Sequence, residues 1–270
     1  MDLKLAGHVA LVTGSTSGIG YATARRLALE GAQVVVNGRD AARTEAAVDR
    51  LRDELRATGA SDAERVTGIA ADLGTADGCA QLVADIGAID ILVNNLGIFE
   101  PKPFESIPDS DWLRFFETNV MSGVRLARAF LPAMKAADWG RIVFVSSESG
   151  ICPPPEMVHY GMTKSAQLSV SRGIAETCAG TGVTVNSVLP GPTLTEGVRD
   201  FIGTLAREQG LSFDDATRAF FKDARPTSLL RRFIEPDEVA ALIAWVCSPI
   251  SSATTGAALR ADGGVVRSLV

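Results

Sequence analysis

Short runs of β-branched and other apolar residues alternate along the chain with longer stretches in which apolar residues recur every three or four positions. The short runs predict strands at residues 8–13, 33–37, 65–70, 90–94, 141–146, 183–188 and 257–261. The longer stretches predict helices at residues 19–29, 41–57, 76–86, 111–135, 160–178 and 236–247. This alternation is typical of βαβ units, so we expect an α/β fold with a doubly wound sheet of seven mostly parallel strands and helices on both faces.

One long stretch, residues 192–235, lies outside this alternation and has a weaker helical pattern of its own. No linker, repeat or low-complexity segment interrupts the chain, so we expect a single domain over residues 1–270. Ligands of open α/β sheets bind beyond the carboxyl ends of the strands, and the stretch follows such an end. We therefore predict that residues 192–235 form a helical substrate lid, with a peripheral insertion that only packs as the alternative.

The composition is that of an ordinary packed protein, with 46% apolar and 21% charged residues. The 26 basic and 32 acidic residues give a formal net charge of -6, which argues against nucleic acid and anionic lipid as partners. The apolar runs are far shorter than the ~20 residues that cross a bilayer, and the first residues lack a signal-peptide pattern, so we expect a cytoplasmic protein and no membrane partner. The four cysteines form no C-x-x-C pair and there are only two histidines, so we expect reduced thiols and no metal site.

A glycine-rich segment follows the first predicted strand and opens the first predicted helix. Glycine lets the backbone turn tightly and approach a pyrophosphate, and the start of a helix offers free N–H groups to it. The spacing is G-x-x-x-G-x-G, for which an ordinary strand-to-helix turn is the alternative interpretation. The position in the first βα unit favours dinucleotide binding by Gly14, Ser15, Thr16, Ser17, Gly18, Ile19 and Gly20.

The end of the second predicted strand indicates which dinucleotide is bound, because the adenosine ribose is expected there. A carboxylate would pair with the ribose hydroxyls of NAD, whereas a guanidinium would hold the 2′-phosphate of NADP. Gly38 stands where the acid is expected, and Arg39 follows it. Asp40 is also within reach by spacing, but it has the position of the N-cap of the next helix. We therefore predict that NADP(H) is preferred through Arg39 and keep NAD(H) as the alternative cofactor.

Tyr160 and Lys164 are four residues apart with a helical pattern after them, so both side chains can lie on one helix face. Such a pair usually lies on the surface and has no function. Ser147, however, ends a predicted strand, where a hydroxyl points into the ligand crevice. A phenol has a pKa near ~10, and a neighbouring ammonium lowers it toward the range of an acid/base catalyst. Ser147 would then hydrogen-bond a substrate oxygen while Tyr160 exchanges its proton. Ser146 offers a second hydroxyl, and we choose Ser147 on its spacing to Tyr160.

Five motifs occur in order along nearly the whole chain. They are Thr13-Gly14-x-x-x-Gly18-Ile19-Gly20, Asn94-Asn95-x-Gly97, Tyr160-x-x-x-Lys164, Pro190-Gly191 and Asp262-Gly263-Gly264. With these motifs the chain resembles the short-chain dehydrogenase/reductase family in its common form. The resemblance implies a Rossmann-type fold and an NAD(P)(H)-dependent oxidoreductase that interconverts a ketone or other carbonyl and a secondary alcohol.

The resemblance also implies roles for individual residues. Tyr160 would be the acid/base, Lys164 would bind the nicotinamide ribose and lower the tyrosine pKa, and Ser147 would orient the substrate. Asn119 would hold a water in a proton relay, with a helix-interior amide satisfied by the backbone as the alternative. The remaining implied cofactor-binding residues are Asp72, Leu73, Asn95, Gly97, Pro190, Gly191, Thr193 and Thr195. Asp72 has helix capping as its alternative, and Leu96, which replaces the usual alanine, either narrows the site or fills a neighbouring gap.

The segments that surround this site, residues 98–105, 151–159 and 192–235, match no motif. Phe99, Phe104 and Met157 are expected to form an apolar wall beside the site, with loop core as the alternative. Together with the phenylalanines of the 192–235 stretch, which could enclose a substrate, they favour a ketone or secondary alcohol with a medium-sized apolar body. An anionic group of the substrate could meet the basic residues of that stretch, which are Arg199, Arg207, Arg218 and Lys222. His159 is expected to be hydrogen-bonded or to face solvent.

The resemblance further implies a homo-oligomer, a tetramer or a dimer, that assembles through the helices at 111–135 and 160–178 and the last strand. The alternative function is a catalytically silent dinucleotide-binding module that acts through protein contacts. A small-molecule carbonyl or alcohol is the expected substrate partner of the enzyme.

Overall fold

Seven strands form one parallel sheet in the computed structural model of the protein, which describes residues 1–59 and 63–269. All six strand pairings are parallel, and the order across the sheet is β3-β2-β1-β4-β5-β6-β7. The strands are β1 (Val9–Val12), β2 (Gln33–Gly38), β3 (Val66–Ala70), β4 (Ile91–Asn94), β5 (Gly140–Val145), β6 (Val183–Pro190) and β7 (Ala258–Ala261). All seven predicted strands and the doubly wound fold are confirmed.

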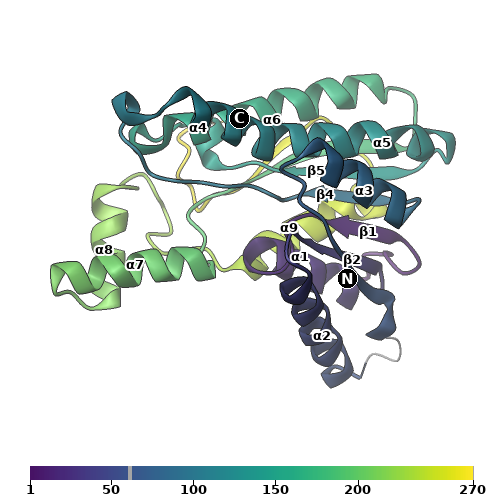
Figure 1. Ribbon diagram of the computed structural model, residues 1–270, viewed down its shortest axis with the longest axis horizontal. Helices are drawn as coiled ribbons and strands as arrows, with labels where there is room; N and C mark the ends of the chain where they lie inside the picture. The colour runs from purple at the N-terminus through teal and green to yellow at the C-terminus, as the bar shows by residue number, and fades with distance from the viewer. Residues whose placement is uncertain (60–62, 270) are drawn as a thin grey trace.

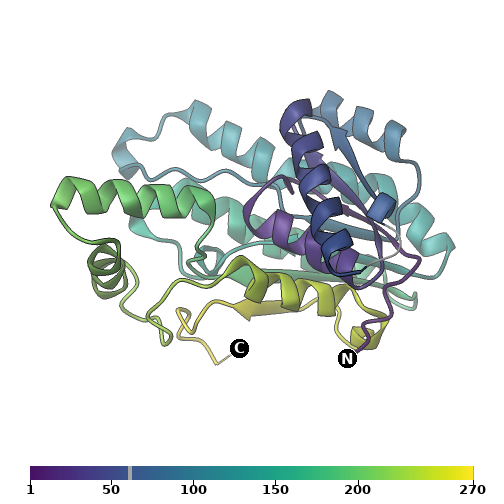
Figure 2. The same cartoon turned by 90° about the horizontal axis from the view of Figure 1, so that it is seen from below.

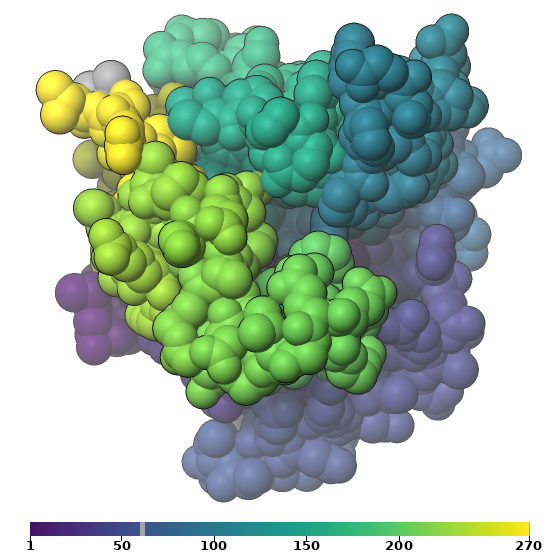
Figure 3. Space-filling view, turned by 90° about the vertical axis from the view of Figure 1, so that its left-hand side faces the viewer, coloured from purple at the N-terminus to yellow at the C-terminus, as the bar shows by residue number. Residues whose placement is uncertain are grey.

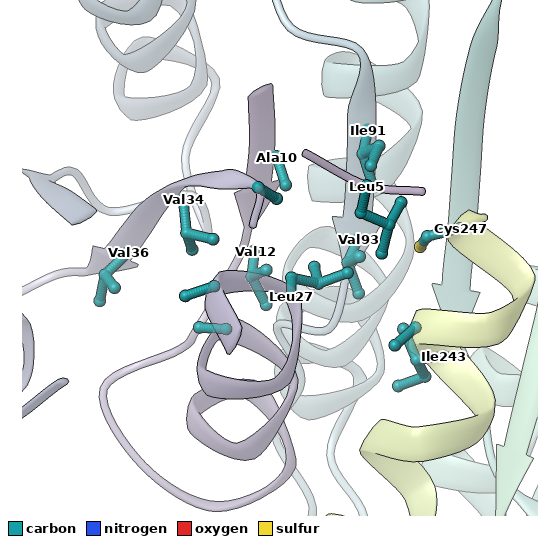
Figure 4. Packing of buried hydrophobic residues seen from close by; sticks show 14 of the residues in the cluster. Leu5, Ala10, Val12, Leu27, Val34, Val36, Ile91, Val93, Ile243 and Cys247 are labelled. Carbon is teal, nitrogen blue, oxygen red and sulfur yellow. The ribbon is translucent and has the colours of Figure 1, made fainter. Parts of the chain in front are cut away.

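Helices cover both faces of the sheet (Figure 1). One layer consists of α1 (Gly18–Leu29), α2 (Ala41–Ala57) and α9 (Pro236–Cys247), and the other contains α3 (Ala76–Ile86), α5 (Ser122–Ala136) and α6 (Val158–Thr177). Side chains alternate along the strands: Ala10 and Val12 join the core under α1 and α9, while Leu11 joins the core under α5. Figure 4 shows the first of these cores, where Leu27 and Ile243 meet the sheet.

The prediction of a single regular helix at 111–135 is wrong. It comprises α4 (Asp109–Phe116), a π-helical turn over Glu117–Met121 and then α5. A π turn inserts one extra residue into the helical repeat, which apolar periodicity does not reveal, and such turns are common at functional sites. The turn contains Asn119. Short 3₁₀ turns occur at η1 (Ala63–Arg65), η2 (Phe104–Ser106), η4 (Glu148–Gly150), η5 (Pro155–Met157) and η6 (Pro249–Ser251).

The weakly helical stretch at 192–235 contains two helices, α7 (Glu196–Gln209) and α8 (Phe213–Asp223). They project from the body of the molecule (Figure 2). The space-filling view from the left-hand side of Figure 1 shows a recess between this green segment and the teal residues above it (Figure 3). The segment has its own small apolar core, which includes Ile202, Phe221 and Phe233. Most of its phenylalanines therefore pack on one another, which corrects the expectation that they enclose the substrate.

The strand order reverses between β1 and β4, because β2 and β3 continue on one side of β1 and β5 to β7 on the side of β4. Ligands of doubly wound sheets bind beyond the carboxyl ends of the strands at such a point. The glycine-rich segment follows β1, and Asn95 follows β4, so the fold places both at this position. Among the described residues, no helix is long and apolar enough to cross a membrane.

Candidate active site

Two neighbouring elements bring the predicted catalytic side chains together. Ser147 lies just beyond β5 and caps the η4 turn, while Tyr160 and Lys164 lie one turn apart on α6. The Ser147 hydroxyl lies close enough to the Tyr160 phenol to lower its pKa by hydrogen bonding. Ser146 instead donates to the main-chain oxygen of Lys164 at 2.8 Å. Ser146 therefore fastens α6 to the end of β5, and Ser147 is the hydroxyl that faces the tyrosine.

Burial controls the electrostatics of this group. The Lys164 side chain is buried, and its Nζ donates to the main-chain oxygen of Val145 at 2.9 Å and lies 5.5 Å from the centre of the Tyr160 ring. Burial lowers the pKa of Lys164 to about 7, and the nearby Glu148 carboxylate opposes that change. Burial also raises the pKa of the Tyr160 phenol above its usual value, while its hydrogen bond to Ser147 lowers it. The lowering of the tyrosine pKa by Lys164 thus stays a prediction.

Glu148 and Arg225 are two charged neighbours of the site that the sequence interpretation missed. The Glu148 carboxylate accepts hydrogen bonds from the Ser147 hydroxyl and from the main-chain N–H of Ser149, the latter at 2.7 Å. Its other oxygen lies 3.2 Å from Nε of Arg225, a residue of the 192–235 segment. An acid directly after the candidate serine was the one visible signal, but nothing in the sequence pointed to its distant partner.

Asn119 is held in place by protein groups. Its Nδ2 donates to the main-chain oxygen of Ile98 and to Oγ1 of Thr163, both at 3.0 Å, and its Oδ1 accepts from the N–H of Ile98 at 2.8 Å. The side chain therefore joins the π turn to the loop after β4 and to α6. This agrees with the alternative interpretation, in which the amide makes its hydrogen bonds to protein groups. Its main-chain oxygen accepts from Gln167 at 2.6 Å. A role of Asn119 in a water relay stays a prediction.

The glycine-rich segment fits the pyrophosphate of a dinucleotide. Gly14 and Gly18 have φ of 60° and 57°, a region that favours glycine, and a Cβ on Gly20 would stand 2.5 Å from the main-chain oxygen of Gly14. Ser17 is the N-cap of α1 but makes no side-chain capping bond, which leaves the first N–H groups of the helix for a ligand. Asn95 supports the loop, since its Nδ2 donates to the main-chain oxygen of Gly14 at 3.1 Å.

Not every predicted loop residue is free to bind. The hydroxyl of Ser15 is buried between β1 and β2, where it donates to the main-chain oxygen of Val12 at 2.6 Å. Ile19 packs partly against the core, whereas Thr16 is half-buried beside Gly38. Leu96 packs against the core on the α5 side of the sheet and approaches Gly14, so of its two interpretations the structure favours the filled gap.

The end of β2 leaves no space for a carboxylate at position 38. A Cβ on Gly38 would lie 2.6 Å from Cγ2 of Thr16 and 2.7 Å from Oγ1 of Thr44. The Asp40 side chain accepts from the N–H of Arg43 at 2.8 Å, so the capping interpretation of Asp40 is confirmed. Arg39 is exposed, and within residues 1–59 and 63–269 it has no hydrogen bond or ion pair.

The other predicted cofactor residues differ in how they are used. Asp72 is exposed, and the capping alternative for it is wrong, because Thr75 caps α3. The Leu73 side chain is buried in the core, which leaves only its backbone for a ligand. Thr195 caps α7 and touches the space beside Gly18.

The remaining residues lie around the ends of β4 and β6. Thr193 is buried, with its hydroxyl donated to the main-chain oxygen of Gly191 at 2.9 Å. Gly191, after Pro190 at the end of β6, has no space for a Cβ, which would lie 2.5 Å from the main-chain oxygen of Asp262. A Cβ on Gly97 would lie 3.4 Å from Nζ of Lys164, so the loop after β4 passes directly over the lysine.

The surroundings of Tyr160 agree only partly with the sequence interpretation. Phe99 is 53% exposed and meets the Tyr160 ring edge-on at 6.4 Å between centroids, as an apolar wall would. His159 is neither hydrogen-bonded nor solvent-facing. It is fully buried against Phe115 and Trp112, and both ring nitrogens lack a hydrogen-bond partner. The helix packing of α4 on α6, which the sequence pattern does not show, encloses it.

A parallel doubly wound sheet with a glycine-rich loop at its reversal point, and with serine, tyrosine and lysine beside it, defines the class of dinucleotide-dependent oxidoreductases. The model of the short chain dehydrogenase family matches residues 8–203. The chain belongs to the short-chain dehydrogenase/reductase family and has the reaction class of that family, NAD(P)-dependent interconversion of carbonyl and alcohol.

Individual relatives match over almost their whole length. The chain is 50% identical over 270 residues to the uncharacterized oxidoreductase YvaG of Bacillus subtilis, with 100% of both chains covered. It is 34% identical over 269 residues to the D-beta-hydroxybutyrate dehydrogenase of Cupriavidus necator, covering 97% of this chain and 99% of the relative. The L-sorbose reductase of Gluconobacter frateurii, solved in complex with NADPH and L-sorbose, superposes with a TM-score of 0.91 at 30% identity, with 100% of both chains covered.

Proposed function

We propose that the protein is an NADP(H)-preferring carbonyl reductase or secondary alcohol dehydrogenase in which Tyr160 is the acid/base. The observation that carries this proposal is the grouping of Ser147, Tyr160 and Lys164. Nζ of Lys164 lies 5.5 Å from the centre of the Tyr160 ring, and Ser147 is close enough to lower the pKa of the tyrosine. In reduction, Tyr160 donates its proton to the substrate oxygen, and in oxidation it accepts the proton from the alcohol. Ser147 holds the same oxygen by a hydrogen bond.

The cofactor supplies or accepts the hydride when it is bound. Gly14, Gly18 and Gly20 with the start of α1 would hold its pyrophosphate, and Lys164 would bind its nicotinamide ribose. The preference for NADP(H) rests on Arg39, an exposed guanidinium without a partner among the described residues, next to a position where no carboxylate fits. A guanidinium binds a phosphate through two parallel hydrogen bonds, which is the reason to prefer the 2′-phosphorylated cofactor.

We further propose that the substrate is a neutral ketone or secondary alcohol. Of the basic side chains of the 192–235 segment that could meet an anion, Arg218 pairs with Asp215, and Arg207 bonds Thr204. The one arginine of this segment that reaches the site, Arg225, lies between Glu148 and Glu156. Arg225 is thus shared by two carboxylates and offers no unpaired charge to a carboxylate substrate beside Ser147.

Replacement of Tyr160 by phenylalanine tests the reaction. The unsubstituted protein should oxidise NADPH with neutral ketones such as L-sorbose and cyclohexanone faster than with acetoacetate, and Tyr160→Phe should abolish turnover while it retains NADPH binding. Tyr21 is the only other tyrosine of the chain, so Tyr21→Phe is the matched control. Full turnover by Tyr160→Phe would refute the role of the tyrosine. Tight NADPH binding without turnover of any substrate would favour the catalytically silent module.

We also propose a cytoplasmic homo-oligomer, a tetramer or a dimer. Leu113 and Phe116 on α4 support association, because they are 71% and 39% exposed and apolar. Sedimentation that finds a monomer at micromolar concentration would contradict this assembly. Residues 192–235 are proposed to be the substrate lid, since Arg225 of this segment contacts Glu148, the residue after Ser147.

A further inference from the structure

A buried carboxylate next to the catalytic serine has no part in the proposed reaction. Glu148 is 5% exposed, and one of its oxygens accepts from the Ser147 hydroxyl, from the Ser149 hydroxyl at 3.0 Å and from the Ser149 N–H at 2.7 Å. An ionised carboxylate only accepts hydrogen bonds, so the proton of the Ser147 hydroxyl points at Glu148. The lone pairs of Ser147 are then what Tyr160 meets.

Arg225 provides the opposite charge from another part of the fold. It follows α8 in the 192–235 segment, its side chain is 12% exposed, and its Nε lies 3.2 Å from Glu148. Its Nη1 lies 3.2 Å from Glu156, in the η5 turn between Ser147 and Tyr160. Arg225 thus links the segment to both ends of the loop that connects the catalytic serine and tyrosine.

We propose that Arg225 is a positioning residue, carried on the lid, that neutralises Glu148 and thereby frees the Ser147 hydroxyl to bind substrate and sets the charge beside Tyr160. This inference rests on the proposed function, because it gives Ser147 and Tyr160 the roles stated there. With Arg225 in place, the guanidinium shares the carboxylate, so Glu148 holds the serine proton less tightly and Ser147 can turn it toward a carbonyl oxygen. Without Arg225, an unpaired anion would retain that proton.

Glu148 and Arg225 also change the pKa of Tyr160. The charged and titratable groups that face Tyr160 are Glu148 from η4, Lys164 from α6 and Arg225 from the lid, with the neutral Ser147 hydroxyl and the Phe99 ring beside them. The Glu148 charge raises the pKa of Tyr160, and the Arg225 charge lowers it. Loss of Arg225 removes the second effect and leaves the first, so both changes move the tyrosine pKa upward.

The experiment compares pH profiles of kcat for the oxidation of sorbitol, cyclohexanol and 3-hydroxybutyrate with saturating NADP⁺. Arg225→Gln should move the rise of kcat to higher pH by on the order of one pH unit, as expected for a nearby charge in a partly buried site. Arg225→Lys, which keeps the charge, should stay close to the unsubstituted profile. In the double variant Glu148→Gln with Arg225→Gln, the rise of kcat should move most of the way back to the pH of the unsubstituted protein, because both charges are removed.

The matched control is Arg218→Gln, because Arg218 lies on the same segment but is 71% exposed and, within the described part of the chain, pairs only with Asp215. It should leave the profile unchanged. A second measurement needs no substrate: hydrogen exchange in α7 and α8 should become faster in Arg225→Gln than in Arg218→Gln, because the lid loses its attachment to Glu148 and Glu156.

An unchanged profile in Arg225→Gln, or lid exchange equal to that of Arg218→Gln, overturns the inference and leaves the proposed function intact. Activity of Tyr160→Phe overturns the proposed function instead. If the unsubstituted protein oxidises none of the three alcohols, the hydrogen exchange result decides whether Arg225 holds the lid.

Discussion

The variant Arg39→Ala tests the contact with the 2′-phosphate of the cofactor separately from the other contacts in the site. The side chain is exposed and has no partner among the described residues, so its removal should leave the free energy of unfolding unchanged. The neighbouring backbone is held independently by the Asp40 cap and by the close approach of Thr16 to Gly38. Any change in affinity therefore reports on a ligand contact rather than on folding.

The size of the effect follows from the kind of contact. Hydrogen bonds to a charged group contribute about 1.5–3 kcal/mol, which corresponds to a loss of roughly 10- to 150-fold in NADPH affinity. NADH lacks the 2′-phosphate, so its affinity should change by less than about twofold. Because the contact is exposed, the preference of the unsubstituted protein for NADPH should also weaken as salt is added.

Fluorescence titration of NADPH and NADH measures both dissociation constants. Arg26→Ala is a suitable control, since Arg26 is an exposed arginine near the other end of α1 that pairs with Glu30. Equal losses for the two cofactors in Arg39→Ala, or no loss for either, would refute the reasoning from Gly38 and Arg39. In that case the ratio of the two dissociation constants of the unsubstituted protein would decide which cofactor is preferred.

Two further predictions address the residues around the tyrosine. Ser147→Ala should lower kcat by about 100-fold or more, because it removes a hydrogen bond to the reacting oxygen. Ser146→Ala should instead lower the free energy of unfolding by about 1 kcal/mol, because it removes the buried hydrogen bond to the main-chain oxygen of Lys164. If Ser146→Ala lowered kcat more than Ser147→Ala does, Ser146 would be the serine that binds the substrate. Burial lowers the pKa of His159 below its usual value, so the unfolded chain binds the proton more readily than the folded chain does. The free energy of unfolding should therefore be highest above the pKa of the unfolded histidine, about 6.5, and should fall as the pH drops below it. Urea unfolding from pH 8 to 5 should show this fall, His159→Phe should lack it, and the same fall in both proteins would show that another group is responsible.

The sequence by itself determined the elements, because their signals are local. Apolar spacing follows directly from the two-residue repeat of a strand and the 3.6-residue repeat of a helix, and it located every strand of the sheet. Short motifs located the glycine loop and the Tyr160–Lys164 pair for the same reason, since each lies within one turn or one helix. The N-cap of α2 at Asp40 was likewise visible from neighbouring residues alone.

Only the tertiary structure decided which side chains meet across the fold. The two serines at the end of β5 are equivalent in the sequence, and the docking of α6 gives Ser146 to the backbone and Ser147 to the tyrosine. Arg225 is 77 residues from Glu148, and no periodicity connects residues on a strand end and on a distant segment. The phenylalanines of 192–235 could have faced the substrate or one another, and the packing of α7 on α8 decided in favour of the second for most of them. Contacts of this kind depend on how whole elements pack, and a pattern read along one element carries no information about its partner.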